Sequence, residues 1–172
     1  HADFVPDKAE VDKYNELMEE RQRGEPIAYL VGHRGFWTLD LLVTPDVLIP
    51  RAETELLVEL ALARIPLGVE FRIADLGTGS GAIALAIAGD RPHARVLATD
   101  ASRAALAVAT ANAKRLGIDN VDFAEGDWCA ALGSRTFDMI VSNPPYIAAT
   151  DAHLGQGDLR FEPPAALTSG AD

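Results

Sequence analysis

Residues 71–82 read Phe-Arg-Ile-Ala-Asp-Leu-Gly-Thr-Gly-Ser-Gly-Ala, an apolar strand (71–75) that runs into a glycine-rich turn and then into an apolar helix. Further apolar segments that resemble strands follow at 95–99, 121–124 and 137–142, and helical patterns lie near 80–88 and 102–116. Strands that alternate with helices in this way form a parallel sheet joined by right-handed crossovers. The sequence therefore predicts an α/β fold.

The first seventy residues have a different pattern, with one polar helix predicted at 7–23 and a second helix at about 53–65. Between them, the aromatic and partly alternating segment 36–43 is predicted to pair with 47–49 as an antiparallel hairpin across the turn at 44–46. The last twenty residues are rich in Pro, Gly and Ala and are predicted to form a loop.

The chain has 172 residues, enough for one domain with a small appendage, and carries a formal net charge of −11. Such acidity argues against tight nucleic-acid binding, although a local patch of Arg21, Arg23 and Arg34 stays open. A single cysteine, Cys129, fits a reducing cytoplasm. The four histidines have no metal-ligand spacing and no apolar run could span a membrane, so we expect neither a metal site nor a membrane segment.

The glycine-rich turn predicts a ligand site, because Gly77, Gly79 and Gly81 let a ligand approach the backbone where a helix begins. The turn by itself does not separate a dinucleotide from S-adenosylmethionine. Asp75, directly before it, favours S-adenosylmethionine, because a carboxylate repels a pyrophosphate but attracts an ammonium or a sulfonium group.

The ends of the next two strands carry residues suited to a nucleoside. Asp100 ends the second strand 23 positions after Gly77, close to the spacing of about 20 expected for a carboxylate that binds ribose hydroxyls. The third strand ends at Asp127-Trp128, where Trp128 would pack against a base and Asp127 would address its amino group. A solvated Asp100 and a core Trp128 are the alternatives that stay open.

The fourth strand ends in Asn143-Pro144-Pro145-Tyr146, a tetrad suited to hold a planar amino group in front of a methyl donor. The Asn143 side-chain oxygen and the Pro144 carbonyl can each accept one N–H of the target, and Tyr146 can lie flat on it. Asn-Pro-Pro is also common in ordinary loops. The chemistry needs no general base, because a protonated amide loses its proton readily to water.

Together, the four strand ends resemble those of class I S-adenosylmethionine-dependent methyltransferases with a Rossmann-like sheet. The resemblance narrows to the release factor glutamine methyltransferases through four segments, 23–32, 48–55, 142–147 and 162–167. These read Arg-Gly-Glu-Pro-Ile-Ala-Tyr-Leu-Val-Gly, Leu-Ile-Pro-Arg-Ala-Glu-Thr-Glu, Ser-Asn-Pro-Pro-Tyr-Ile and Glu-Pro-Pro-Ala-Ala-Leu. The match runs from about residue 20 onward.

The resemblance implies methyl transfer from S-adenosylmethionine, giving S-adenosylhomocysteine, to N5 of the glutamine in the Gly-Gly-Gln motif of peptide-chain release factors. It implies a cytoplasmic enzyme whose partner is the release factor, with no direct contact to nucleic acid. The residues expected to hold the cofactor are Asp75, Leu76, Gly77, Thr78, Gly79, Asp100, Asp127, Trp128 and Asn143. Those expected to hold the glutamine amide are Asn143, Pro144, Pro145 and Tyr146, of which Asn143, Pro144 and Tyr146 are the catalytic candidates.

Two departures from the family pattern bear on these expectations. Ala52 stands where the family usually has a second proline, and the sequence ends just after the fourth strand's loop, so the last three strands of a seven-stranded sheet are expected to be absent. Residues 1–50 are expected to be the end of a helical domain plus a hairpin, and 51–172 an incomplete methyltransferase domain whose fourth strand is an edge.

Three other functions stay open. An adenine-N6 methyltransferase of DNA or RNA would use the same tetrad, although the net charge and segment 50–55 count against it. A ribosomal-protein glutamine methyltransferase is a closer relative that should differ in this segment. The third alternative is a fragment that binds cofactor weakly and catalyses nothing.

Overall fold

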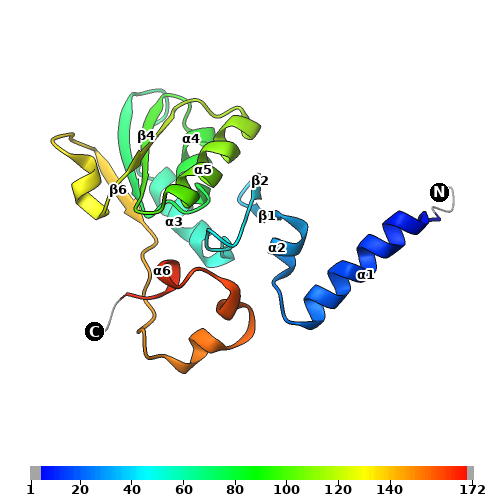
Figure 1. Cartoon of the computed structure of the whole chain (residues 1–172). Coiled ribbons are helices and arrows are strands. Elements are labelled where there is room, and N and C mark those ends of the chain that lie inside the picture. The colour runs from blue at the N-terminus through cyan, green and yellow to red at the C-terminus, as the bar shows by residue number, and fades with distance from the viewer. Residues whose placement is uncertain (1–4, 170–172) are drawn as a thin grey trace.

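The computed structural model describes residues 5–169, and its centre is a parallel four-stranded sheet (Figure 1). Its strands, in the spatial order β5-β4-β3-β6, are Val121–Glu125, Ala94–Asp100, Phe71–Leu76 and Met139–Ser142. The predicted α/β fold class is confirmed, and each of the four predicted parallel strands is present with bounds that differ by at most two residues. As expected for the fourth strand, β6 lies at an edge of the described sheet.

The strand order places a switch point between β3 and β6. From β3 the chain steps outward to β4 and β5 and then returns to the other side of β3 to form β6. In open parallel sheets, ligands bind outside the carboxyl ends of the strands at such a reversal. The topology therefore directs attention to the loops that follow these four strands.

Three helices, α3 (Glu55–Leu62), α4 (Ala82–Asp90) and α5 (Arg103–Leu116), contribute to the main core with alternate residues of the sheet, such as Ile73, Val96 and Val141. The residues 82–88 of α4 are all apolar and all buried, so this helix is the central one. Side chains on the opposite side of the sheet form a smaller cluster of Ala74, Leu76, Leu97 and Leu132, the last from the 3-10 helix η2 (Trp128–Leu132). The predicted helices at 80–88 and 102–116 are confirmed by α4 and α5.

The predicted hairpin is wrong in its register and in its second strand. The observed strands are β1 (His33–Phe36) and β2 (Leu39–Leu42), joined by the two-residue turn Trp37-Thr38. Two-residue hairpin turns need a positive φ at their first central residue, which is unfavourable for a Trp and so was not predicted. Trp37 adopts φ +56, and its ring N–H donates to Asp90 Oδ2 at 3.0 Å while its backbone N–H donates to Glu55 Oε1 at 2.8 Å.

Residues 47–49 do not form the predicted strand. Val47 and Ile49 are buried in a separate apolar cluster with Ala105 and Val108 of α5. The turn at 44–46 is present, since the Val47 N–H donates to the Thr44 carbonyl at 3.1 Å, but it carries the chain along α5 instead of back along β2.

The terminal segments also differ in part from expectation. α1 (Lys8–Gln22) confirms the first predicted helix, yet none of its residues is buried and it projects from the body of the molecule (Figure 1). The second predicted helix begins as the 3-10 turn η1 (Ala52–Thr54), continues as α3 and ends at Leu62 instead of residue 65. A short helix, α2 (Ile27–Val31), precedes the hairpin.

The predicted C-terminal loop contains three short helical turns: η3 (Ala152–Gly155), η4 (Gly157–Phe161) and α6 (Pro164–Leu167). A bridge between Ile147 and Thr168 closes this segment back onto the chain that leaves β6. The expectation of an irregular loop is therefore wrong in part, because Pro163 and Pro164 suit the start of a helical turn.

The hairpin and the sheet are joined by the buried side chain of Asn112 on α5. Its Oδ1 accepts the Leu42 N–H at 2.7 Å, and its Nδ2 donates to the Leu42 and Ser80 carbonyls at 3.0 Å. The predicted division into 1–50 and 51–172 stays a prediction, and residues 1–4 and 170–172 of those two parts lie outside the described residues.

Candidate active site

A cavity of about 650 Å³ lies where the loops after all four parallel strands meet. Its size is typical of pockets for small molecules. The strands contribute Gly77 and Gly79 (β3), Asp100 (β4), Asp127 and Trp128 (β5), and Asn143 (β6). We call it the strand-end cavity. Six of the nine residues expected to hold a cofactor line it.

The glycine turn forms one wall of the strand-end cavity. Gly77 and Gly79 have φ values of +71 and +56, which side-chain-bearing residues rarely adopt. A Cβ atom built on either glycine would meet no protein atom within 4 Å, so the bare backbone faces open space. A ligand can therefore approach the peptide groups of this turn directly.

Asp100 has a structural role that the sequence did not reveal. Its Oδ2 accepts the Gly79 N–H and its Oδ1 accepts the Ser102 N–H, both at 2.9 Å. The residue is half-buried instead of a solvated strand end. Asp100 thus ties the glycine turn to the start of α5 while its carboxylate lines the cavity.

The charge of the strand-end cavity selects among ligands. Asp46, Asp100 and Asp127 line it, and the described lining includes no Lys, Arg or His. Carboxylates attract a cation and repel a phosphate group. The cavity therefore favours a ligand with positive charge and disfavours a dinucleotide, whose pyrophosphate is anionic.

Trp128 is held at the cavity in an unusual backbone conformation. It is 47% exposed, has φ +43 and begins the 3-10 helix η2. A left-handed conformation costs a residue with a side chain about 1–2 kcal/mol, and such strain is concentrated at functional sites. An exposed indole beside the cavity can stack on a planar group. Its predicted packing against a base stays a prediction.

Asp75, Leu76 and Thr78 do not line the strand-end cavity. Leu76 belongs to the smaller core cluster, and the buried Thr78 hydroxyl donates to Asp75 Oδ2 at 2.7 Å. Asp75 is fully buried, and its Oδ1 has no hydrogen-bond partner among the described residues. Burial raises the pKa of Asp75 to about 6, although the hydrogen bond from Thr78 opposes this rise.

The raised pKa of Asp75 predicts a pH-dependent stability. Between about pH 4 and about pH 6 the folded chain keeps a proton that the unfolded chain releases, so the free energy of unfolding falls as pH rises through this window. At about 1.4 kcal/mol per pKa unit, the total fall is about 3 kcal/mol. Urea unfolding of wild type and Asp75→Asn across this range measures it, because Asn cannot ionise.

A second variant tests the direction of this pH dependence independently. Thr78→Val removes the hydrogen bond that lowers the pKa of Asp75, so the fall in stability should continue to higher pH than in wild type. A difference between wild type and Asp75→Asn that does not change with pH would contradict the prediction.

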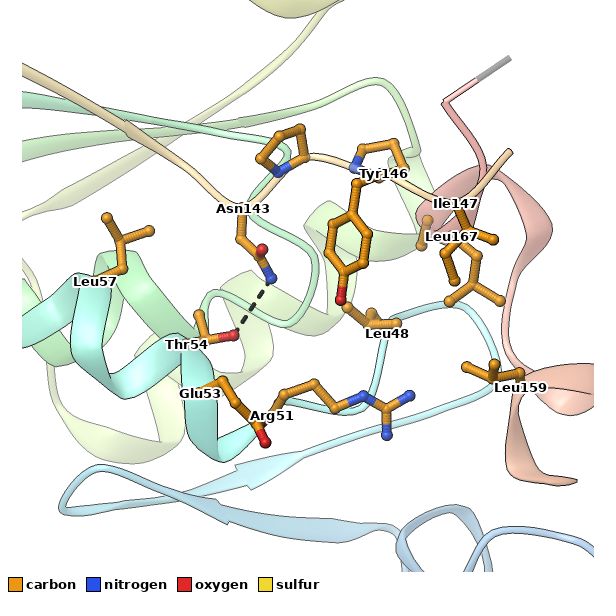
Figure 2. A pocket seen from close by; sticks show the side chains of 13 residues that line it. Leu48, Arg51, Glu53, Thr54, Leu57, Asn143, Tyr146, Ile147, Leu159 and Leu167 are labelled. Atoms are coloured by element: carbon orange, nitrogen blue, oxygen red, sulfur yellow. Dashed lines mark hydrogen bonds between the residues drawn. The ribbon is translucent and has the colours of Figure 1, made fainter. Parts of the chain in front are cut away.

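All four residues of the tetrad line a second, smaller cavity of about 330 Å³ (Figure 2). We call it the tetrad cavity. Pro144 and Tyr146 line it, and Tyr146 is 77% exposed. Asn143 and Pro145 line both cavities and so form part of the wall between them. Asn143 therefore belongs to the lining of both cavities.

The Asn143 side chain bonds a residue that sequence reasoning missed. Asn143 Nδ2 donates to Thr54 Oγ1 at 3.3 Å (Figure 2). Its Oδ1, for which no hydrogen bond occurs within the described part of the chain, is left as an acceptor. Thr54 lies within the segment 48–55 that the resemblance singled out, but no local pattern indicated this contact.

A buried carboxylate, Glu162, was also missed. Its side chain is fully buried; Oε1 pairs with the Arg51 guanidinium and Oε2 accepts the Ile49 N–H at 3.0 Å. The contact joins the segment before η1 to the C-terminal turns, and Leu48 and Ala166 from these two segments line both cavities. No local pattern in the segment 162–167 indicates this buried contact.

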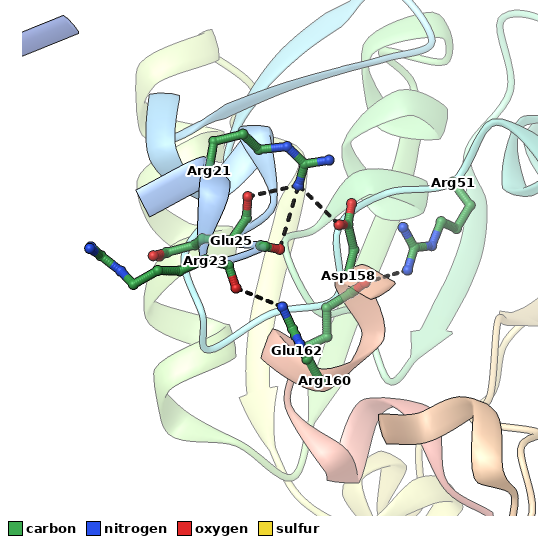
Figure 3. A network of polar contacts seen from close by, with 8 residues as sticks. Arg21, Arg23, Glu25, Arg51, Asp158, Arg160 and Glu162 are labelled. Carbon is green, nitrogen blue, oxygen red and sulfur yellow. Dashed lines mark hydrogen bonds and ion pairs between the residues drawn. The ribbon is translucent and has the colours of Figure 1, made fainter. Parts of the chain in front are cut away.

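Further contacts fix the C-terminal turns to the first helices (Figure 3). Arg21 Nη1 lies 3.2 Å from Asp158 Oδ1 and donates to the Glu25 carbonyl at 3.0 Å. Arg160 Nη2 donates to the Arg23 carbonyl at 2.6 Å. The guanidinium of Arg21, one of the three arginines considered as a basic patch, is therefore engaged within the chain.

Among residues 5–169, no group of three or more His, Cys, Asp and Glu side chains is placed to hold a metal ion. No helix in the described part of the chain is both long enough and apolar enough to cross a membrane.

Comparison with known proteins identifies a family match over most of these elements. The family described as methyltransferase small domain matches residues 52–158. The chain is similar to the release factor glutamine methyltransferase of Xylella fastidiosa (strain 9a5c), with 61% identity over 172 residues, which are 100% of this chain and 62% of that protein. It is 53% identical over 153 residues to the enzyme of that name from Escherichia coli (strain K12), covering 89% of this chain and 55% of that protein.

The chain spans less than two thirds of the length of these curated relatives. Among solved structures, the precorrin 8w decarboxylase of Methanobacterium thermoautotrophicum has a TM-score of 0.50 and 29% identity. That match covers 70% of this chain and 61% of the decarboxylase.

Proposed function

Because the chain belongs to the methyltransferase small domain family, we propose that it transfers a methyl group from S-adenosylmethionine to a glutamine side chain, namely N5 of the glutamine in the Gly-Gly-Gln motif of peptide-chain release factors. The observation that carries the proposal is the position of Asn143 between the strand-end cavity and the tetrad cavity. The similarity to proteins named release factor glutamine methyltransferase supports the substrate. The site of action is the cytoplasm, and the partner is the release factor, without nucleic acid or membrane.

The strand-end cavity fits S-adenosylmethionine by charge and by shape. The cofactor carries an ammonium and a sulfonium group, which suit a lining that contains Asp46, Asp100 and Asp127. Gly77 and Gly79 leave its backbone wall open. In our proposal Asp100 binds the ribose hydroxyls and Trp128 packs on the adenine with Asp127 beside its amino group. When bound, the cofactor supplies an electrophilic methyl group.

Asp75, Leu76 and Thr78 contribute indirectly in this proposal. They lie behind the glycine turn, where the Thr78 hydroxyl is bonded to Asp75 and Leu76 is in the core. The negative charge of Asp75, when it is ionised, would favour a cation in the adjoining cavity. In this proposal these three residues shape the glycine turn, and Asp75 adds a negative charge behind it.

The tetrad cavity holds the glutamine amide in the proposed reaction. An amide nitrogen is a weak nucleophile because its lone pair is delocalised into the carbonyl group. Asn143 Oδ1 and the Pro144 carbonyl each accept one N–H, so positive charge that grows on the nitrogen faces two acceptors. Tyr146 lies over the planar amide, Pro145 stiffens the turn, and the product loses its proton to water, so no general base is assigned.

Transfer of radiolabelled methyl groups from S-adenosylmethionine to a release factor tests the proposal. Label should enter the factor with Gly-Gly-Gln and not a matched factor in which this glutamine is replaced by alanine. Duplex DNA and ribosomal protein are offered as competing acceptors. Label in DNA but not in release factor would instead support the adenine-N6 alternative.

The cofactor assignment predicts the effect of Asp100→Ala. Affinity for S-adenosylhomocysteine in calorimetry should fall by about 1.5–3 kcal/mol, the range for a hydrogen bond to a charged group. Because Asp100 also holds Gly79 and Ser102, the variant should lose some thermal stability as well.

Asp119→Ala is the control, since this exposed carboxylate lies before β5, at the other end of the sheet. It should leave the affinity unchanged. Wild-type affinity in Asp100→Ala would remove Asp100 from the site, and tighter binding of NAD than of S-adenosylhomocysteine would overturn the cofactor assignment.

A further inference from the structure

Asp75 is a buried carboxyl group behind the glycine turn of the strand-end cavity. It lies on β3, two residues before Gly77, which lines the cavity. Its side chain is fully buried, and its Oδ2 accepts a hydrogen bond from the Thr78 hydroxyl at 2.7 Å, whereas its Oδ1 has no partner among the described residues. Burying a charge is costly unless it is paired. Ionisation of Asp75 is therefore unfavourable in the chain without a ligand.

Among the described residues, the elements packed against β3 offer Asp75 no positive side chain at this end of the sheet. β6 and η2 contain no Asp, Glu, Lys, Arg or His, although η2 contains Cys129. α4 and β4 carry Asp90 and Arg95 at their ends remote from the glycine turn, and Asp100 at the end of β4 near it. A cation in the strand-end cavity would therefore bring a positive charge that these elements do not provide.

These surroundings favour the protonated form of Asp75. Burial raises its pKa most strongly and Asp100 raises it further, whereas the Thr78 hydroxyl and the Ala84 N–H at the start of α4 lower it. The resulting pKa is about 6. A positive charge in the adjoining cavity would stabilise the carboxylate and so lower this pKa.

We propose that Asp75 distinguishes the methyl donor from the product of methyl transfer. S-adenosylmethionine binds with loss of the Asp75 proton to the solvent, and the carboxylate favours its sulfonium over the neutral sulfur of S-adenosylhomocysteine. The two molecules share the adenosine, ammonium and carboxylate groups and differ by one methyl group and one positive charge. This inference rests on the cofactor named in the proposed function, and Asp75 acts by charge without lining the cavity.

The direction of the pH dependence follows from the number of bound protons. Below about pH 6 the free chain holds a proton that the S-adenosylmethionine complex releases, so affinity for this molecule falls as pH falls. The Kd of S-adenosylhomocysteine divided by that of S-adenosylmethionine should therefore rise roughly threefold to tenfold from about pH 5 to about pH 7. Isothermal titration calorimetry with each molecule measures this Kd ratio.

Asp75→Asn is the matched variant, because its amide keeps the size of the carboxyl group but cannot ionise. Its Kd ratio should change less than about twofold over the same pH range and should stay near that of wild type at low pH. Ionisation of the ligands and of other carboxylates occurs in both proteins and cancels in the comparison. Asp119→Asn, at the other end of the sheet, should keep the wild-type rise. Equal rises in wild type and Asp75→Asn would overturn the inference.

Proton release tests the inference in wild type without any methyl transfer. At about pH 6, heats of S-adenosylmethionine binding in phosphate and in bis-Tris should differ by the heat of protonating the buffer, and S-adenosylhomocysteine should release fewer protons. Equal proton release by the two molecules would overturn the inference and leave the proposed function standing. Greater release with S-adenosylmethionine in a chain that methylates no release factor would support the inference and reject the proposed function. A chain that binds neither molecule would reject both.

Discussion

Asn143→Ala is expected to lower kcat for glutamine methylation by roughly 10²–10³, by analogy with the loss of one oxyanion-hole donor. The substitution removes one of two acceptors that face the amide nitrogen as positive charge develops on it. Five of the six cofactor candidates that line the strand-end cavity lie at the ends of β3, β4 and β5, so affinity for S-adenosylhomocysteine should change much less. Single-turnover methylation of release factor and calorimetry measure the two quantities.

Asn143→Asp is the matched control for this prediction. It keeps an acceptor oxygen in the same position and adds a negative charge, which favours a developing cation. Activity should therefore survive in Asn143→Asp to a greater extent than in Asn143→Ala. If both variants methylate release factor at nearly the wild-type rate, Asn143 is only a turn residue and the proposed holding of the amide is wrong.

Glu162→Ala is expected to lower the free energy of unfolding by about 3 kcal/mol, the lower end of the range for breaking a buried ion pair. The Glu162 side chain is fully buried, and its removal leaves the Arg51 guanidinium and the Ile49 N–H without their partner. The lower end applies because the Arg51 side chain is 35% exposed and regains some hydration. Urea unfolding followed by circular dichroism measures the loss.

Two variants control for charge and for burial. Glu162→Gln keeps an acceptor for the Ile49 N–H, so it should destabilise less than Glu162→Ala. Glu125→Ala breaks the ion pair with Arg103, in which the Glu125 side chain is 44% exposed and the Arg103 side chain 84% exposed. It should lower the free energy of unfolding by less than about 1 kcal/mol. Equal losses in Glu162→Ala and Glu125→Ala would show that the buried pair does not hold the C-terminal turns in place.

Glu162→Ala should also affect the candidate active site, because the segments that Glu162 joins contribute residues to the lining of both cavities. Ala166 of the C-terminal turns lines the strand-end cavity and the tetrad cavity. Leu48, in the segment before η1 that Glu162 contacts, also lines both. Loosening this contact should therefore weaken cofactor binding as well as substrate binding.

The parallel sheet, and the residues at the carboxyl ends of its strands, could be predicted from the sequence because their signals are local. Each strand is an apolar run of a few residues, and each is followed by its own Gly, Asp, Asp-Trp or Asn-Pro-Pro-Tyr segment. Parallel strands joined by helices bring their carboxyl ends to one edge, so the order along the chain predicts which segments meet.

The hairpin shows where local signals become ambiguous. An alternating segment such as 36–43 indicates a strand but not the residues at which the chain turns. The turn at Trp37 depends on its contacts with Asp90 and Glu55, which lie 53 and 18 residues away in sequence. Such contacts between distant segments can offset the cost of a positive φ at a tryptophan, and no local pattern indicates them.

The sequence by itself thus determined the α/β sheet, the positions of its strand ends and the negative charge beside the glycine turn. The tertiary structure decided that Asp75 is buried behind that turn, that Asp100 holds Gly79, and that Asn143 stands between two cavities. It also decided the pairing of Arg51 with Glu162, which are 111 residues apart. Periodicity and turn residues report the conformation of neighbouring residues, whereas these contacts arise when distant segments pack, so no local pattern contains them.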